Sequence, residues 1–381
     1  MEGAPPGSAA AGDVRRITLV IHSLVMGGAQ RVATRLANHW VEAGMEVTLC
    51  TLAGREVPPF FELHPAVKLE PLGIAAPSST KLQALASNAS RVLALRKAIR
   101  RSRPELVVSF LTRTNILTLL AGVRLGVPIV ASEATDPMQW NHGWTWRAMR
   151  RLTYPLADTV VALSTKGGEF YRRFLRAGRV RVVPNPVSEP AIAPDFERLA
   201  RNTTIIAMGR LVHLKRFDLL IDAFAALSQR FPQWDLLILG EGPLRGELQA
   251  RVARHALEER IHLPGVTADP EACLRRASIF VCSSDIEGFP MALCEAMACG
   301  LAVITTRYHD DVGEIVKDGV NGCLVRKGSA KDLETALDLL MSRRGMRTVF
   351  GRQAANVAGK YGEQSVMAQW DEVIRGLVSR D

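Results

Sequence analysis

The sequence predicts an α/β protein with two Rossmann-like domains, and three observations support this prediction. Apolar strands alternate with amphipathic helices from about residue 15 to 340, a pattern typical of parallel sheets that helices cover on both faces. The alternation pauses at a stretch with three prolines, 184–190, and starts again with a strand at 203–209. The chain has 381 residues, more than one hydrophobic core usually organises. We therefore expect two domains that face each other across a cleft, with a ligand at the carboxyl ends of the strands.

Each half of the chain contains its own set of candidate strands. The first set comprises residues 16–22, 46–52, 106–110, 128–132, 159–163 and 180–183. The second set comprises residues 203–209, 235–239, 261–263, 278–282 and 302–306. Between the first two strands, apolar side chains from Ala29 to Val41 recur at helical spacing, and Gly44 ends this helix.

The boundaries of the parts follow from composition and periodicity. Residues 1–14 are rich in Ala, Gly and Pro, so we expect a disordered tail and not a signal peptide. The first domain is expected over residues 15–187, a linker over 188–200 and the second domain over 201–363. Apolar residues at helical spacing predict a final helix within 364–381.

The composition predicts a folded protein with an anionic partner. Hydrophobic residues make up 48% of the chain and charged residues 23%, and no apolar run approaches the roughly 20 residues that span a bilayer. The net charge of +10 favours a phosphorylated ligand, an anionic membrane surface or a nucleic acid. We do not expect a nucleic acid, because the chain has four Tyr and no recognisable nucleic-acid-binding module.

The six cysteines indicate a reduced, cytoplasmic protein. They form no C-x-x-C pair and have no neighbouring His, so neither a disulfide framework nor a zinc site is expected.

Two carboxylates flank a glycine turn near the C-terminal end. Glu287 follows the strand 278–282, Gly288 comes next, and Glu295 lies inside a helix of small residues. The turn and the helix N-terminus offer backbone N–H groups to an anion, with an acid on either side. This arrangement predicts binding of a phosphate-bearing sugar donor.

Two cations follow the first strand of the second half. Gly209 and Arg210 come directly after that strand, and Lys215 precedes the next helix. Arg can hold a diphosphate through two parallel hydrogen bonds, and Lys adds a compact charge. Alone, these residues could equally be solvated surface charges. Together with the acidic turn downstream, they favour an anion site.

These motifs, taken in order, resemble the family-4 retaining glycosyltransferases, which have the GT-B fold. The resemblance covers nearly the whole chain apart from the N-terminal tail. It is carried by Gly27-Gly28-Ala29-Gln30-Arg31-Val32, Gly209-Arg210 with Lys215, Gly240-Glu241-Gly242-Pro243, and Glu287-Gly288-Phe289-Pro290 through Glu295 to Gly300. It implies an acceptor-binding first domain, a nucleotide-sugar-binding second domain, and a C-terminal helix that packs back on the first domain.

The resemblance also assigns roles to side chains. Arg210 and Lys215 would hold the donor pyrophosphate, Glu295 would bind the ribose hydroxyls, and Glu287 would face the transferred sugar near the reacting carbon. It implies further donor contacts from Gly28, Gly209, Val266, Gly288, Phe289 and Met291. Among these, Phe289 and Met291 would offer backbone N–H groups, Val266 would lie near the base, and Gly28 would approach the phosphate from the first domain.

A narrower resemblance concerns the acceptor. The segments 107–115, Ser132-Glu133 and 146–155 are similar to bacterial enzymes that build lipid-linked glycans, in particular N-acetylgalactosaminyltransferases acting on undecaprenyl-diphosphate-linked acceptors. This makes Glu133 a candidate acceptor-site residue. Many relatives have a histidine after Ser-Glu that contacts the donor sugar, whereas this chain has Ala134. Asp136, His22 and His142 are the candidates to take its place, and the sequence does not decide among them. The donor sugar is therefore open, with a UDP-linked N-acetylhexosamine as the first expectation and GDP-mannose as the second.

The segment 81–103 has seven basic residues and no acid. The predicted helix places Arg96 and Arg100 in line with an apolar stripe formed by Leu82, Leu85, Ala89, Val92 and Leu93. Arginines in line with an apolar face are costly unless they meet an anion. We expect this helix to border the acceptor site and to meet a lipid diphosphate or anionic headgroups. The alternative is a solvated basic helix end.

A second group combines aromatic and basic side chains: Trp140, Trp144, Trp146, Arg147, Arg150 and Arg151. Aromatic rings near cations suit a membrane interface or a sugar-stacking surface, while core packing is the alternative for any single Trp.

The expected activity is transfer of a sugar from a nucleotide-diphosphate donor to a lipid-linked or polysaccharide acceptor, with retention of configuration. Arg210, Lys215 and the helix N-terminus would stabilise the departing diphosphate, so we expect neither a metal ion nor another cofactor. The enzyme would work in the cytoplasm, peripherally on the inner face of the membrane. Two alternatives are a sugar-nucleotide epimerase of the same architecture and a non-catalytic scaffold that binds nucleotide sugars.

Overall fold

The computed structural model describes residues 14–75, 81–135, 137 and 143–378, without the side chains of 81–86 and 378. The expected N-terminal tail lies outside the described residues except for Val14. The chain divides into two compact units. The first consists of residues up to Pro186 and those from Val366 onward, and the second runs from Val187 to Ser365.

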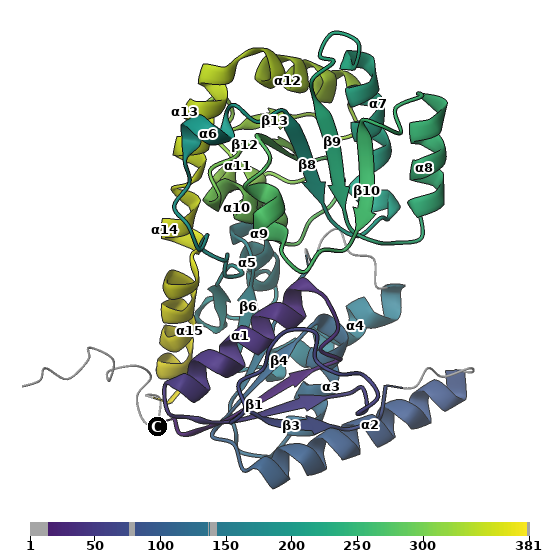
Figure 1. Cartoon of the computed structure of the whole chain (residues 1–381). Coiled ribbons are helices and arrows are strands. Elements are labelled where there is room, and N and C mark those ends of the chain that lie inside the picture. The colour runs from purple at the N-terminus through teal and green to yellow at the C-terminus, as the bar shows by residue number, and fades with distance from the viewer. Residues whose placement is uncertain (1–13, 76–80, 136, 138–142, 379–381) are drawn as a thin grey trace, which may run out of the picture. The chain divides into compact units, whose positions relative to one another are not determined.

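The first unit is built on a parallel sheet of seven strands in the order β3-β2-β1-β4-β5-β6-β7 (Figure 1). Its strands are β1 (Arg16–Ile21), β2 (Glu46–Thr51), β3 (Lys68–Pro71), β4 (Leu106–Phe110), β5 (Ile129–Ser132), β6 (Thr159–Ala162) and β7 (Val180–Val182). Its helices are α1 (Gly28–Glu42), α2 (Lys81–Ser102), α3 (Thr112–Gly122), α4 (Gly143–Thr153), α5 (Thr165–Arg172) and α15 (Glu363–Val378), with the 3-10 turns η1 (Tyr154–Leu156) and η2 (Ala177–Arg179).

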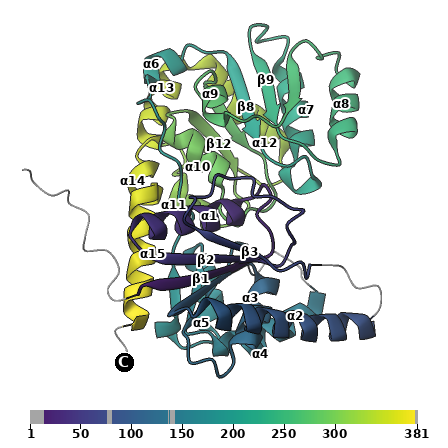
Figure 2. The same ribbon diagram turned by 60° about the horizontal axis from the view of Figure 1, so that its bottom comes forward.

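Helices cover both faces of this sheet, because alternate strand residues point to opposite sides. One face packs on α1 and α15 through a core that includes Leu19, Trp40 and Trp370. The other face packs on α2, α3 and α5 through a core that includes Val20 and Tyr154. Figure 2 shows α1 on one side of β1 and β2 and the layer of α2 to α5 on the other.

The C-terminal helix α15 belongs to the first unit because it packs against α1. The Trp370 and Trp40 rings meet edge to face, with centroids 6.4 Å apart. Asp371 is buried beside them and accepts a hydrogen bond of 3.1 Å from the Trp40 indole.

The second unit has a parallel sheet of six strands in the order β10-β9-β8-β11-β12-β13. Its strands are β8 (Thr204–Met208), β9 (Asp235–Leu239), β10 (Ile261–Gly265), β11 (Ile279–Cys282), β12 (Ala302–Thr306) and β13 (Cys323–Val325). Its helices are α6 (Phe196–Leu199), α7 (Phe217–Leu227), α8 (Arg245–Arg254), α9 (Pro270–Leu274), α10 (Met291–Ala298), α11 (Val312–Ile315), α12 (Ala330–Ser342), α13 (Arg344–Ala354) and α14 (Val357–Tyr361), with the 3-10 turn η3 (His213–Lys215). One face packs on α7, α8 and α12, and the other on α10 and α14.

The fold class expected from the sequence, two Rossmann-like α/β units, is confirmed. Two details differ from the expectation. Two edge strands, β3 and β13, were not predicted. The expected linker, 188–200, contains helix α6 and belongs to the second unit, to which Val187 is joined by a hydrogen bond from its N–H to the Tyr361 carbonyl. Within the described part of the chain, every helix is too short or too polar to cross a bilayer.

Candidate active site

The carboxyl ends of the strands in the second unit gather the loops that the sequence singled out. β8 and β11 are neighbours in the middle of the sheet. The segment after β8 carries Arg210 and, on η3, Lys215, while the segment after β11 carries Glu287. Because the strands run in parallel, both segments leave the sheet at one edge, which is where open α/β sheets bind ligands.

Lys215 and Glu287 form an ion pair at this edge. The Nζ atom of Lys215 lies 2.5 Å from Oε1 of Glu287, and the two side chains are 23% and 14% exposed. Burial lowers the pKa of Lys215, but the negative Glu287 and the Cys282 sulfur outweigh this effect, so the pKa lies above its ordinary value. The Lys215 side chain is therefore protonated and positively charged near neutral pH. Arg210 lies exposed at the end of β8.

Glycines allow the backbone to approach closely beside these cations. Gly240 follows β9 with φ +141°, and a Cβ atom on it would lie 1.9 Å from the Gly209 carbonyl oxygen. A Cβ atom on Gly209 would lie 3.1 Å from the Lys215 side chain. The Gly-Glu-Gly pattern at 240–242 therefore reflects the contact between the ends of β8 and β9, which positions the turn leading to Lys215.

We predict that Gly240→Ala destabilises the protein by about 2–4 kcal/mol, because the new methyl group collides with backbone that cannot move independently. Urea unfolding measures the effect. Gly246→Ala is the matched control, since a Cβ atom there meets nothing within 4 Å. Equal unfolding free energies for the two variants would contradict the prediction.

The loop between Glu287 and α10 is held by an aromatic contact. Phe289 packs edge-on against Tyr361 of α14, with ring centroids 5.4 Å apart. Pro290 is the N-cap of α10 and supplies no side-chain hydrogen bond. Gly288, between Glu287 and Phe289, completes the turn.

The N–H groups at the start of α10 differ from the expectation in one respect. The Met291 N–H is bonded to the Phe289 carbonyl at 2.9 Å, so it is not the group that remains for a phosphate. The first bond of the helix runs from Cys294 to Pro290. The N–H groups of Ala292 and Leu293 therefore have no partner within the helix and are the better candidates to face an anion.

The remaining donor candidates lie along the same edge or just behind it. Val266 follows β10 and is 48% exposed, which leaves an apolar side chain for a flat ring to contact. Gly265, before it, accepts a hydrogen bond of 2.8 Å from the Gly240 N–H. Glu295 lies half-buried on α10.

Several residues that build the site were not predicted. Ser284 donates to the Glu287 carboxylate at 2.5 Å, and Ser283 donates to the Lys215 carbonyl at 2.7 Å. Arg216, with φ +49°, pairs with Asp285 at 3.3 Å. The polar run Ser-Ser-Asp directly after the apolar strand β11 was the available signal. Among the described residues, no three His, Cys, Asp or Glu side chains are grouped as metal ligands.

In the first unit, Gly28 lies at the first position of α1, after the end of β1. It is exposed, and its N-cap neighbour Gly27 provides no side-chain hydrogen bond. This matches the glycine turn expected at the carboxyl edge of the first sheet.

Family comparisons identify the chain. The family model for "Glycosyltransferase Family 4" matches residues 26–189, and the model for "Glycosyl transferases group 1" matches residues 191–357. The chain is a glycosyltransferase. Its two parallel-sheet units give this glycosyltransferase the GT-B fold.

Relatives of the glycosyltransferase include two enzymes of Campylobacter jejuni. One is a GalNAc-α-(1→4)-GalNAc-α-(1→3)-diNAcBac-PP-undecaprenol α-1,4-N-acetyl-D-galactosaminyltransferase, 26% identical over 94% of this chain and 98% of its own length. The other is an N-acetylgalactosamine-N,N'-diacetylbacillosaminyl-diphospho-undecaprenol 4-α-N-acetylgalactosaminyltransferase, 25% identical over 93% of this chain and 97% of its own.

Solved structures share the fold of the glycosyltransferase. Sucrose-phosphate synthase from Thermosynechococcus elongatus has a TM-score of 0.82 and 18% identity, over 96% of this chain and all of its own. The Anabaena protein HepE, in complex with UDP and glucose, has a TM-score of 0.75 and 18% identity over the same shares.

The structure does not place Glu133 where an acceptor could reach it. Its residue is 1% exposed, and its carboxylate accepts hydrogen bonds from Thr112 at 2.9 Å and from the Tyr154 hydroxyl. Asn115 lies 3.5 Å from the same carboxylate. Burial raises the pKa of Glu133 to about 7, against the opposing effect of Thr112, Arg150 and Asn115. Glu133 therefore joins β5 to the first turn of α3, and its carboxylate is not available to contact an acceptor.

Arg96 also has a different role from the expected one. Its Nη1 atom donates to the carbonyls of Ala121 and Val123, at 2.7 Å each, at the C-terminal end of α3. A cation at this position satisfies carbonyls that the helix leaves without partners. The argument that Arg96 needs an anionic ligand therefore does not apply, whereas Arg100 is exposed on α2.

The apolar stripe expected on α2 is displaced. The buried residues are Leu95, Ala98 and Ile99, and of the expected members Val92 packs beside them, whereas Leu93 is 66% exposed. The expected members Leu82 and Leu85 lie outside the described side chains.

The residue that follows Glu133 is an alanine that lies against the core. Ala134, at the position where the resemblance implies a His, packs against the core of the first unit. Of the candidates to replace that His, Asp136 and His142 lie outside the described residues, as does Trp140.

Proposed function

We propose that the glycosyltransferase transfers a sugar, with retention of configuration, from a UDP-linked N-acetylhexosamine to a lipid-linked acceptor. One observation carries this proposal: a partly buried Lys215–Glu287 ion pair and the exposed Arg210 stand at the carboxyl ends of adjacent strands. A nucleotide-diphosphate sugar needs fixed positive charge for its diphosphate and an acid near its sugar, and this edge offers both.

The proposed chemistry is the stabilisation of a leaving group. As the bond to the diphosphate breaks, negative charge grows on its oxygens and positive charge on the sugar carbon. Arg210 and Lys215 neutralise the diphosphate, and the N–H groups of Ala292 and Leu293 add fixed dipoles. Glu287, held by Ser284, faces the sugar and supports its developing positive charge.

The printed activities of related proteins support the donor and the acceptor. Both Campylobacter enzymes are named for transfer of N-acetylgalactosamine to undecaprenol-linked glycans, and structures of HepE contain UDP or UDP-glucose. GDP-mannose is the second candidate donor. Family membership gives neither an epimerase nor a non-catalytic scaffold any independent support.

A lipid-linked acceptor requires work at an anionic membrane, and we propose peripheral binding at its cytoplasmic face. The helix layer of α2 to α4 exposes Trp144 at 75%, Leu152 at 72% and Leu93 at 66%. Arg100 and Arg151 are also exposed in this layer. Apolar side chains next to cations are typical of interfacial binding.

A donor screen tests the proposal. The purified protein is incubated with UDP-N-acetylgalactosamine, UDP-N-acetylglucosamine, UDP-glucose and GDP-mannose, with and without an undecaprenyl-diphosphate-linked glycan, and released nucleotide is measured. NMR of the product gives the anomeric configuration. Acceptor-dependent release with an α-linked product supports the proposal. An inverted product, or epimerised donor without transfer, refutes it.

We predict that EDTA leaves the transfer rate unchanged within about twofold, because Arg210 and Lys215 supply the positive charge that a metal ion would otherwise provide. Initial rates are compared before and after exhaustive chelation and after adding Mg²⁺ or Mn²⁺. A rate that collapses on chelation and returns with either ion would contradict the prediction.

A further inference from the structure

Basic side chains also gather at the carboxyl edge of the first unit's sheet. β1 and β4 are adjacent parallel strands. His22 follows β1, and Arg113 lies in the first turn of α3, which follows β4. Both side chains therefore leave the sheet at the same edge, and both residues are exposed.

Arg113 is fixed by an aromatic platform and not by an acid. Its guanidinium lies over the Trp146 ring of α4, 5.0 Å from the centroid. Among the described residues it makes no hydrogen bond or ion pair. Stacking on an indole restrains the guanidinium plane and leaves its in-plane N–H groups free for the two parallel hydrogen bonds that phosphate accepts.

The charge at this edge acts on His22. Partial burial lowers the pKa of His22, and the positive charges of Arg113 and Arg91 lower it further. Arg91 is held in place by bonds to the Ile74 carbonyl at 2.8 Å and to Asn88 at 2.7 Å. Because the two arginines disfavour a positive charge on His22, the electrostatic potential at this edge is positive. A bound anion would offset it.

The buried network beneath Arg113 holds its backbone in place. Leu111 adopts φ +75°, which is unusual for a residue other than glycine, and its N–H is bonded to the Ser132 carbonyl. Thr112 is bonded to Glu133, which follows β5, so the turn that carries Arg113 is anchored directly before it. Backbone strain of this kind persists only where the surroundings enforce it, often at binding sites.

We propose that Arg113, stacked on Trp146 and accompanied by His22 and Arg91, binds the diphosphate of the lipid-linked acceptor. This inference rests on the proposed function, which calls for two diphosphates. The donor diphosphate has Arg210 in the second unit, and the cluster around Arg113 provides for the second diphosphate in the first unit. Trp146 adds an apolar surface for the adjoining prenyl chain.

Farnesyl diphosphate, a soluble prenyl diphosphate, tests the inference in the presence of saturating UDP. Binding is measured by calorimetry, and the pKa of His22 by NMR of ¹³C-labelled histidine, assigned with His22→Gln. Arg113→Gln should weaken farnesyl diphosphate binding about tenfold or more, since a charge-assisted bidentate contact is lost. The ligand should raise the pKa of His22 in the wild type and not in Arg113→Gln.

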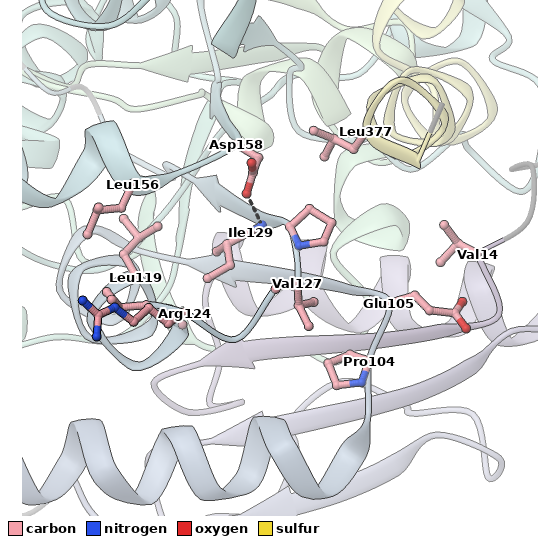
Figure 3. Close-up of a pocket in the computed structure, with 14 residues that line it drawn as sticks. Val14, Pro104, Glu105, Leu119, Arg124, Val127, Ile129, Leu156, Asp158 and Leu377 are labelled. Carbon is pink, nitrogen blue, oxygen red and sulfur yellow. Dashed lines mark hydrogen bonds between the residues drawn. The ribbon is translucent and has the colours of Figure 1, made fainter. Parts of the chain in front are cut away.

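Arg124→Gln is the matched control, because Arg124 lies beyond the other end of α3. There it lines a cavity of about 740 Å³ at the amino ends of the strands, together with Leu119, Leu156 and Asp158 (Figure 3). This variant should bind farnesyl diphosphate like the wild type. Both variants change an exposed side chain, so their Tm values should stay within about 2 °C of the wild type.

The outcomes separate this inference from the proposed function. Equal binding by Arg113→Gln and Arg124→Gln, or an unmoved His22, overturns the inference even if UDP and transfer activity are as proposed. Binding to anionic phospholipid vesicles is measured in parallel. If Arg113→Gln loses vesicle binding but keeps farnesyl diphosphate binding, the inference is also overturned and Arg113 is assigned to lipid headgroups. If UDP does not bind but Arg113-dependent farnesyl diphosphate binding persists, the donor proposal fails and the diphosphate subsite stands.

Discussion

Replacing Lys215 with Ala should lower kcat/KM for the nucleotide sugar about 100- to 1,000-fold, the usual cost of removing one group that stabilises developing negative charge. Lys215 is mostly buried and already carries its proton in the free protein. A water molecule that fills the space left by the substitution would not restore this positive charge. The loss should appear in kcat as well as in KM if Lys215 acts on the departing diphosphate. Initial rates over a range of donor concentrations measure both constants.

Lys331→Ala is the matched control for this experiment. Lys331 also pairs with a carboxylate, Glu334 at 2.9 Å, but its side chain is 76% exposed and lies on α12. A double-mutant cycle with Glu287→Gln adds a second test. Because Lys215 and Glu287 are in direct contact, their combined loss should be smaller than the product of the single losses. Independent effects, or a Lys215→Ala enzyme within about threefold of the wild type, would remove Lys215 from the proposed mechanism.

The central strands could be predicted from the sequence because they are buried on both faces. β1, β4, β8 and β11 consist mostly of apolar residues, and their predicted bounds agree with the structure within a residue. β3 contains Lys68, Glu70 and Pro71, and it lies at the sheet edge, where such residues are tolerated. Its composition therefore resembles that of a loop, and the chain alone gave no reason to choose a strand.

The candidate donor site at the carboxyl ends of the strands in the second unit was predictable for a related reason. Arg210, Lys215 and Glu287 each follow a recognisable strand, and parallel strands bring such segments to one edge. The partners of these residues depend on packing, which a single sequence does not contain.

Helix α2 shows the same limit more clearly. Val92 packs on the core as expected, but Leu93 is exposed, and the fully buried residues of the helix are Leu95, Ala98 and Ile99. The helix was thereby turned so that its arginine at position 96 caps α3, a contact with a segment distant in sequence.

Glu133 should make the protein less stable as the pH rises from about 4.5 to about 7. Its carboxyl is fully buried in the folded state, where its pKa is raised to about 7 from the ordinary value of 4.5. Between these values the folded protein keeps a proton that the unfolded chain releases, so the free energy of unfolding falls with increasing pH. At about 1.4 kcal/mol for each pKa unit, the loss amounts to about 3 kcal/mol.

Glu133→Gln removes this titration and keeps a side chain of the same shape. Unfolding by urea at about pH 5 and about pH 8 should show the wild type losing roughly 2–3 kcal/mol relative to Glu133→Gln across the interval. Other titrating groups contribute equally to both proteins and cancel in the difference, so the comparison isolates one carboxyl. A difference that does not change with pH would mean that Glu133 is ionised throughout, stabilised by Arg150 and the hydroxyls of Thr112 and Tyr154.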